Sequence, residues 1–394
     1  MNIVILGPFG YGSLADEAVL AGLLKRLLTT DRGEASESDQ PSKHNITVLS
    51  FDPEKTKTIH DTHAVQLANP GSIMNTPAAW EALTQAHLFI VAGGGVLSDQ
   101  GKTPARVWLG AVEHARRIGV KTAVIGVGAL EIADPRERIR LQRLLHNFTD
   151  SSSTRDAESK RILIGYGLNP NRVSYNGDPA LALTNDSITY TPRDRRVGLV
   201  ISEAVPSRAT FGLEHQKVST KLLQSGRTLI KNLDCEVVIF HDDTAAAQEH
   251  VASLRDGLPL DRILTRAVDC PLPLIQTEMA ACQAVFSYTL HGLMLAAGGS
   301  VPVVGLSVER GVTPLLTFLG FPNCALPPQE DGFDATLALV RLREMIAKAP
   351  EISRTVGLRM AMLARKEAQN ARMLEFLVPK RDRYAPRSPK PKRW

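Results

Sequence analysis

The sequence predicts an α/β protein built from two Rossmann-like βα lobes that face a cleft. Three observations support this prediction. The chain has 394 residues, which is longer than one hydrophobic core usually supports. Short apolar, β-branched runs alternate with stretches of helical periodicity in both halves of the chain. Glycine-rich turns follow two of the early runs, which is typical of the ligand-binding edge of a parallel sheet.

In the first half, the alternation of patterns defines a series of strands and helices. Strands are expected at residues 2–6, 46–50, 87–92 and 121–126. Helices are expected at residues 16–29, 105–118 and 135–148. Strands that alternate with helices in this way predict a parallel sheet with helices on both of its faces.

A charge-rich, weakly apolar stretch at residues 185–196 separates this series from a second one. Strands are expected at 197–202, 236–240, 284–287 and 302–306, and helices at 219–232, 245–255, 274–282 and 292–298. We therefore predict an N-terminal lobe at residues 1–188 and a C-terminal lobe at 189–352. An amphipathic helix at 353–378 is expected to close the body and to pack back on the first lobe.

The last segment of the chain is strongly basic. Residues 380–394 contain seven Lys or Arg and one acid, so the net charge of +5 for the whole chain leaves the body at −1. Prolines disfavour a helix in residues 379–394. This tail is interpreted either as a solubilising end or as a segment attracted to anionic lipid headgroups at the inner face of the membrane. Its composition matches no nucleic-acid-binding module.

Other features indicate a cytoplasmic protein without a bound cofactor. No apolar run reaches the roughly 18 to 20 residues that span a bilayer, and no basic segment precedes the short apolar start, so no signal peptide is expected. Four cysteines lie far apart, without the spacing of a zinc site, and are interpreted as reduced core thiols: Cys235, Cys270, Cys282 and Cys324. The sequence therefore predicts no metal or redox cofactor.

The first expected strand ends in a turn that could bind an anion. Gly10 and Gly12 allow the backbone to approach a ligand, and the following helix offers free N–H groups at its start. The glycine spacing does not fit the dinucleotide-binding pattern, and an ordinary tight turn is the alternative. Asp16 and Glu17 either cap this helix or offer a carboxylate to a sugar hydroxyl.

A glycine triplet, Gly93, Gly94 and Gly95, follows the expected strand at residues 87–92. Consecutive glycines beyond a buried strand indicate that some group passes close to the backbone. A ligand is one interpretation, and close packing of a helix on the strand is the other. Asp99 follows the triplet and is a further candidate for substrate binding.

Two later segments hold candidate residues with ionisable side chains. Arg155 precedes Asp156, the expected N-cap of a helix, and could present its planar fork to a carboxylate or phosphate. His291 follows Thr289 in a loop between a strand and a helix, where a functional role is favoured over a structural one. His241 occupies a similar position after residues 236–240, followed by two aspartates, although a metal site there is not expected.

Together these stretches resemble the polysaccharide pyruvyl transferase family in their order along residues 1–325. The matching positions are Gly12, Asp16 and Glu17; Gly93, Gly94 and Gly95; Arg155, Asp156 and Ser159; Asp178 and Pro179; Leu290, His291 and Ala296; and Pro302 to Gly305. The chain departs from the family pattern at Ser13, Ala15 and Thr289, the last of which replaces an arginine. Arg310 stands where the family commonly has a basic residue.

The resemblance implies a GT-B-like transferase that moves a pyruvyl group from phosphoenolpyruvate to a glycan or a lipid-linked sugar. It implies that Arg155 binds the donor's carboxylate or phosphate and that His291 binds phosphate or donates a proton. We expect both to be cleft-surface residues, whose replacement leaves stability near that of the wild type. A glycosyltransferase that uses a nucleotide sugar and a non-catalytic relative remain the alternatives.

Overall fold

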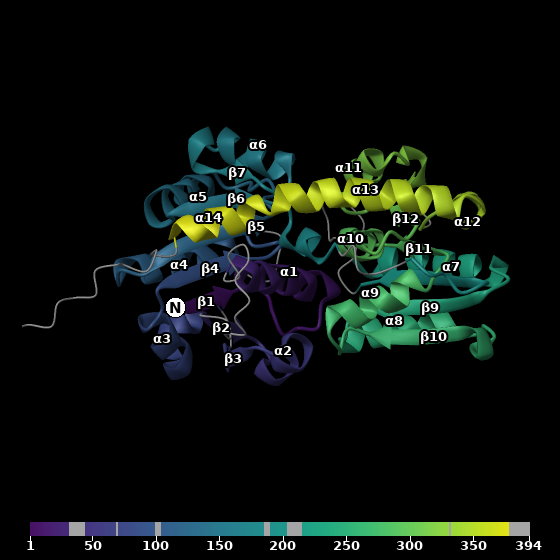
Figure 1. The fold of residues 1–394 in the computed structure, drawn as a ribbon, viewed down its shortest axis with the longest axis horizontal. Coiled ribbons are helices and arrows are strands. Elements are labelled where there is room, and N and C mark those ends of the chain that lie inside the picture. The colour runs from purple at the N-terminus through teal and green to yellow at the C-terminus, as the bar shows by residue number, and fades with distance from the viewer. Residues whose placement is uncertain are drawn as a thin grey trace, which may run out of the picture.

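The computed structural model describes residues 1–30, 44–67, 70–98, 104–184, 190–202, 215–330 and 332–377. Within these residues the chain forms two parallel sheets, each flanked by helices, and a final pair of helices that runs along both (Figure 1). The basic tail and Asp99 lie outside the described residues, as do residues 185–189 of the linker predicted at 185–196.

The first sheet has the strand order β3-β2-β1-β4-β5-β6-β7, and its strands pair in parallel. These strands are β1 (Asn2–Leu6), β2 (Asn45–Ser50), β3 (His63–Gln66), β4 (Leu88–Ala92), β5 (Lys121–Val127), β6 (Ser151–Thr154) and β7 (Ser174–Tyr175). The helical segments between them are α1 (Leu14–Thr30), α2 (Pro53–His60), η1 (Pro70–Asn75), α3 (Pro77–Thr84), α4 (Ala105–Arg117), α5 (Pro135–Phe148), α6 (Ala157–Gly165), η2 (Pro170–Arg172) and, after β7, η3 (Pro179–Leu183).

Alternate residues of these strands enter two different cores, as the period of a strand requires. On one face, Ile3 and Ile5 of β1 pack with α1 and with Leu374 from the end of the chain. On the other face, Val4 and Leu6 pack in a core that includes α4 and α5. The central strands are therefore buried on both sides, which explains their continuous apolar runs.

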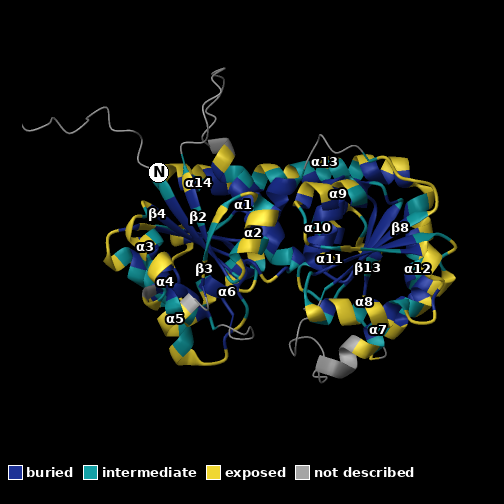
Figure 2. Ribbon diagram, turned by 90° about the horizontal axis from the view of Figure 1, so that it is seen from below, coloured by how far each residue is buried: buried dark blue, intermediate teal, exposed yellow. Residues whose placement is uncertain are grey.

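The second sheet has the order β10-β9-β8-β11-β12-β13 and is also parallel. Its strands are β8 (Arg196–Ile201), β9 (Glu236–His241), β10 (Ile263–Ala267), β11 (Ala284–Ser287), β12 (Val303–Leu306) and β13 (Ala325–Leu326). Its helical segments are α7 (His215–Asn232), α8 (Ala245–Arg255), η4 (Leu260–Arg262), α9 (Leu272–Ala280), α10 (Leu290–Gly298), α11 (Val312–Leu319), η5 (Pro322–Cys324) and α12 (Ala335–Ala347). Figure 2 shows the strands of both lobes as buried and the outer surfaces of the helices as exposed.

The structure divides the single closing helix predicted at 353–378 into α13 (Ala349–Glu367) and α14 (Gln369–Leu377). Ala368, between them, keeps right-handed helical dihedral angles, so the chain bends without reversing. Leu374 of α14 belongs to the core of the first lobe, whereas Met360 of α13 belongs to the core of the second. The expected packing of this segment on the first lobe is confirmed, and the segment also spans the second lobe (Figure 1).

The strands β3, β6, β7, β10 and β13 are absent from the sequence prediction, and three of them have a polar sequence or only two residues. The strand β6 has the sequence SSST and is formed because it pairs with β5 and β7, not because of apolar alternation. The strands β7 and β13 have two residues each. Two of the four cysteines, Cys282 and Cys324, are buried as predicted, whereas Cys235 and Cys270 are only half-buried, and all four are free thiols.

Candidate functional site

Candidate residues from both lobes meet where the carboxyl ends of the two sheets approach each other. Arg155 follows β6, and the glycine triplet follows β4 in the first sheet. His291 lies in the first turn of α10, directly after β11 of the second sheet. The loop after β12 adds Glu309 and Arg310. Parallel strands therefore deliver these distant residues to one region, as open α/β sheets generally do for their ligands.

The central pair of this site is His291 and Asp178. Nε2 of His291 lies 3.1 Å from Oδ2 of Asp178, and the two side chains are 4% and 0% exposed. Burial by itself would lower the pKa of His291, but the negative charge of Asp178 and the hydrogen bond to it raise the pKa above its ordinary value. The imidazole is therefore favoured as a protonated group that donates its Nε2 proton to Asp178.

Asp178 is held in place by the structure around it. Its other oxygen, Oδ1, accepts the N–H of Ala180 and so caps η3. Burial opposes ionisation of Asp178, but the charges of His291 and Arg155 and the hydrogen bond from His291 together lower its pKa. The carboxylate therefore stays ionised and fixes the orientation of the histidine ring.

Thr289 caps the helix that carries His291. Its hydroxyl accepts the N–H of Gly292 at 3.1 Å, so it is the N-cap of α10. The side chain of Thr289 is buried and has a structural partner, which identifies a role for the residue that replaces the family's arginine. An arginine cannot form this cap, since its side chain has no acceptor.

Arg155 lies beside the glycine triplet and the histidine. A Cβ atom added to Gly94 would be 2.8 Å from Nη1 of Arg155 and 3.8 Å from Cε1 of His291. A Cβ atom added to Gly128 would lie 2.8 Å from Nε of the same arginine. The group that passes close to Gly94 is thus the guanidinium of Arg155, whereas a Cβ added to Gly95 meets no atom of the described residues within 4 Å apart from its chain neighbours. At Gly93 the near neighbours are Pro8 and Val96.

Two further carboxyl groups, those of Asp16 and Glu309, lie close enough to His291 for its charge to affect their pKa values. Asp16, from α1, is half-buried, and its burial together with the neighbouring charge of Glu17 raises its pKa to about 7, although the charge of His291 opposes this shift. Glu309 is also half-buried, and burial raises its pKa against the opposing charges of His291 and Arg155. The sequence prediction did not include Glu309, although its position after β12, next to Arg310, was a usable signal.

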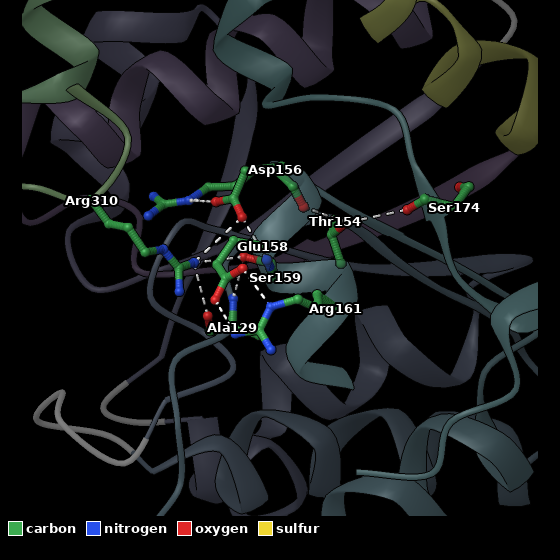
Figure 3. A network of polar contacts seen from close by, with 9 residues as sticks. Ala129, Thr154, Asp156, Glu158, Ser159, Arg161, Ser174 and Arg310 are labelled. Atoms are coloured by element: carbon green, nitrogen blue, oxygen red, sulfur yellow. Dashed lines mark hydrogen bonds and ion pairs between the residues drawn. The ribbon is translucent and has the colours of Figure 1, made fainter. Parts of the chain in front are cut away.

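Arg310 connects the two lobes. Its Nη2 donates to the carbonyl of Ala129 and to Oγ of Ser159, each at 3.0 Å, and lies 3.4 Å from Oδ1 of Asp156 (Figure 3). Asp156 also contacts Nε of Arg155 at 3.1 Å and caps α6 as the sequence predicted. Burial raises the pKa of Asp156, but the two arginines and the bonds from Ser159 outweigh it and lower that pKa. Arg310 therefore has protein partners on the first lobe.

The first glycine turn forms a second connection between the lobes. The carbonyl of Gly12 accepts the N–H of Asp243, and Lys55 forms an ion pair of 2.9 Å with the Asp243 carboxylate. Gly10 donates its N–H to Glu17, whose second oxygen lies 2.8 Å from Nε2 of His60. Glu17 is fully buried and both of its oxygens have protein partners, so it holds the turn and does not fit the predicted contact with a sugar.

The remaining candidates lie away from the central pair or outside the described residues. His241 is buried in β9, and its Nδ1 lies 2.8 Å from the carbonyl of Asp242. Among the described residues, no cluster of His, Cys, Asp and Glu has the geometry of a metal site. Asp99 lies outside the described residues.

The helix α14 contacts the loop that leads into Asp178. Nδ2 of Asn370 donates to the carbonyl of Gly177 at 3.2 Å, and its Oδ1 accepts from Nδ2 of Asn176 at 3.0 Å. These two residues directly precede Asp178. Glu367, one turn earlier, is fully buried and pairs with Arg26 at 2.6 Å. The end of the chain therefore fixes the loop that orients the histidine.

Comparisons with known proteins agree with this architecture. The model of the polysaccharide pyruvyl transferase family matches residues 36–310, so the chain belongs to that family. No curated protein matches the chain by sequence. Among the residues that the structure describes, no helix is long and apolar enough to cross a membrane.

Solved structures with the same fold include proteins that bind nucleotide sugars. A putative UDP-N-acetylglucosamine 2-epimerase from Listeria monocytogenes is 14% identical, with a TM-score of 0.56 over 90% of each chain. A UDP-GlcNAc 2-epimerase from Neisseria meningitidis, bound to UDP-GlcNAc, is 10% identical, with a TM-score of 0.56 over 96% of this chain and 99% of its own. HepE from Anabaena, in complex with UDP-glucose, is 16% identical, with a TM-score of 0.56 over 95% and 99%. At these identities the likeness establishes the fold, which is GT-B-like.

Proposed function

We propose that the protein transfers a pyruvyl group from phosphoenolpyruvate to two hydroxyls of one sugar, in a cell-surface polysaccharide or its lipid-linked precursor. Membership of the pyruvyl transferase family supports the transferase class. The observation that carries the proposal is the buried pair of His291 and Asp178 next to Arg155. This arrangement supplies a proton donor and a fixed cation at one place, which is what the donor's chemistry requires.

The reaction needs protons to move in both directions. One sugar hydroxyl adds to C2 of phosphoenolpyruvate and loses its proton, while C3 gains a proton and becomes a methyl group. The bond between C2 and the phosphate oxygen then breaks and releases phosphate. A second hydroxyl of the same sugar adds to C2 and loses its proton, which closes the cyclic ketal.

The proposed roles follow from charge and position. Arg155 binds the carboxylate or phosphate of the donor. Its side chain is 14% exposed and its Nε contacts the carboxylate of Asp156, while its Nη1 lies beside Gly94. His291, kept protonated by Asp178, donates a proton or binds phosphate. Glu309 and Asp16 are suited to accept hydroxyl protons, because their raised pKa values bring them toward neutral pH.

The competing function is that of a glycosyltransferase with a nucleotide-sugar donor. Its support is that solved structures bound to UDP-sugars share the fold of this chain, and a shared fold does not imply a shared donor. A third hypothesis is that the protein is a non-catalytic relative that binds phosphoenolpyruvate without turnover.

One experiment separates the three functions. The melting temperature of the full chain is measured with phosphoenolpyruvate and with UDP-sugars, and phosphate release is measured with sugar acceptors. A ligand at 100 times its Kd adds about 2.7 kcal/mol to the free energy of unfolding. Stabilisation by phosphoenolpyruvate together with acceptor-dependent phosphate release supports the proposal. Stabilisation by UDP-sugars alone contradicts it, and stabilisation without release indicates a non-catalytic relative.

A further inference from the structure

The closing helices expose one continuous stripe of side chains, here called the closing-helix face. Its positions recur at intervals of three and four residues, so they lie on one side of the helices. It consists of Glu351, Arg354, Leu358, Met362, Arg365, Gln369, Arg372 and Phe376, all of which are exposed. The opposite side of the same helices is buried and includes Val356, Met360, Asn370 and Leu374.

The composition of this face differs from that of an ordinary solvated helix surface. Leu358, Met362 and Phe376 are 66%, 57% and 88% exposed, and Phe376 is the most exposed large apolar side chain of the described residues. Three arginines lie on the stripe with these apolar side chains. The acid on the stripe, Glu351, lies at the end far from Phe376, and the exposed Glu375 flanks Phe376. Apolar side chains separated by arginines are typical of helices that lie in the headgroup region of a bilayer.

The shape of the face suits a planar partner. From Glu351 to Phe376 the stripe extends about 38 Å, at a rise of 1.5 Å per residue. Figure 1 shows α13 and α14 crossing both lobes, and Figure 2 shows them along one edge of the molecule. A protruding ridge with three separated apolar side chains offers little contiguous area to a protein partner but lets each side chain enter a lipid layer.

The charge of the neighbouring sequence complements the same partner. Four residues after Phe376 begins the basic segment 380–394, with seven Lys or Arg and one acid. Arg354, Arg365 and Arg372 therefore continue a positive series along the chain from the closing-helix face into the tail. Basic residues close to an anionic lipid surface each increase binding by about fivefold.

We propose that the closing-helix face docks on an anionic lipid surface, where Leu358, Met362 and Phe376 enter the headgroup region and the three arginines contact lipid phosphates. The expectation from sequence attributed membrane attraction to the tail alone; the structure adds a folded surface beside it. The opposite side of this helix pair contacts Gly177 and Asn176, next to Asp178. Docking thus puts α14 between the lipid surface and the loop that leads into Asp178, the partner of His291. The docking does not depend on which group the enzyme transfers.

The test is sedimentation of the full chain with vesicles of phosphatidylcholine alone or mixed with phosphatidylglycerol. The test variant combines Leu358→Ser, Met362→Ser and Phe376→Ser. The matched control combines Ile139→Ser, Leu260→Ser and Leu274→Ser, whose side chains are 64%, 57% and 57% exposed elsewhere on the surface. A third variant lacks residues 379–394. Circular dichroism establishes that every variant is folded.

We expect the wild type to sediment with the anionic vesicles and the test variant to bind at least about tenfold more weakly, because apolar side chains no longer leave water. The control variant should bind like the wild type, and the truncated variant should keep weaker, salt-sensitive binding. The proposal is overturned if the wild type binds no vesicles, if the test variant binds like the wild type, or if the control loses as much. Light scattering that shows a dimer, abolished in the test variant, would assign the face to a second copy of the chain and also overturn it.

Discussion

Nε2 of His291, at the start of α10, lies 3.1 Å from Oδ2 of Asp178, which follows the last strand of the first sheet. The pair joins residues 113 positions apart and excludes water almost completely. Breaking one partner of a buried ion pair leaves the other charge uncompensated. This geometry changes what a substitution at His291 is expected to do.

His291→Ala should therefore abolish phosphate release and also destabilise the protein, by about 3–5 kcal/mol. The expectation from sequence that His291 is a cleft-surface residue is wrong, because its side chain is buried. His291→Gln keeps a hydrogen-bond donor for Asp178 but not the positive charge, so it should destabilise the protein less than His291→Ala does. Loss of turnover with donor affinity retained indicates proton donation, whereas retention of both makes His291 only a ligand. Normal turnover in the alanine variant would contradict a functional role.

Asp178→Asn should shift the pH dependence of turnover. The charge of Asp178 raises the pKa of His291, so its removal lowers that pKa. If protonated His291 is the active form, activity falls as the pH rises through this pKa. The alkaline limb of the kcat profile should then move to lower pH. An unchanged limb would show that another group controls it.

Gly94→Ala should impair activity, because the new Cβ would lie 2.8 Å from Nη1 of Arg155 and force the guanidinium to move. The control is Gly95→Ala, because the added Cβ has no neighbour within 4 Å among the described residues beyond those next to it in the chain. We expect at least about a tenfold fall in kcat/KM for the first substitution. Melting temperatures of both variants should remain similar. Equal activities would argue that the position of Arg155 is irrelevant, and a loss confined to Gly95→Ala would place the ligand at that open position.

Arg155→Ala should lower kcat/KM about 100-fold or more, since a fixed cation stabilises the developing charge on the donor. Arg161→Ala is the matched control, because Arg161 is exposed and forms only a surface ion pair with Glu158. Steady-state phosphate release at several donor concentrations distinguishes binding from turnover. Similar values for the two variants would remove Arg155 from the proposed site.

Asp16 should make the stability of the protein depend on pH. Its pKa is raised to about 7 in the folded protein by burial, whereas an unfolded Asp titrates near about 4. The folded state therefore binds the proton more tightly, so the associated stability is present below pH ~4 and is lost as the pH rises to about 7. The melting temperature of the wild type relative to Asp16→Asn should fall across this window and level off above it. A constant difference would mean that the carboxyl is freely solvated.

Hydrophobic periodicity and capping residues in the sequence were sufficient to predict most helices and strands of the fold. The strands β1 and β11 and the helices α5 and α8 have the predicted bounds, because strong periodicity and Pro or Thr and Asp caps mark their ends. The strands β3 and β10 were absent from the prediction. The polar strand β6 and the short strands β7 and β13 were also absent, because pairing with neighbouring strands stabilises them. The break at Ala368 was missed because no glycine or proline marks it.

The sequence alone determined the two-lobed α/β fold and drew attention to Arg155, Asp178 and His291 through the order of their motifs. Tertiary structure decided which of them touch. It paired His291 with Asp178, engaged Arg310 with the first lobe and turned Glu17 inward to His60. The reason is physical: periodicity and capping act over a few residues along the chain, whereas a pKa or an ion pair depends on groups brought together from distant strands.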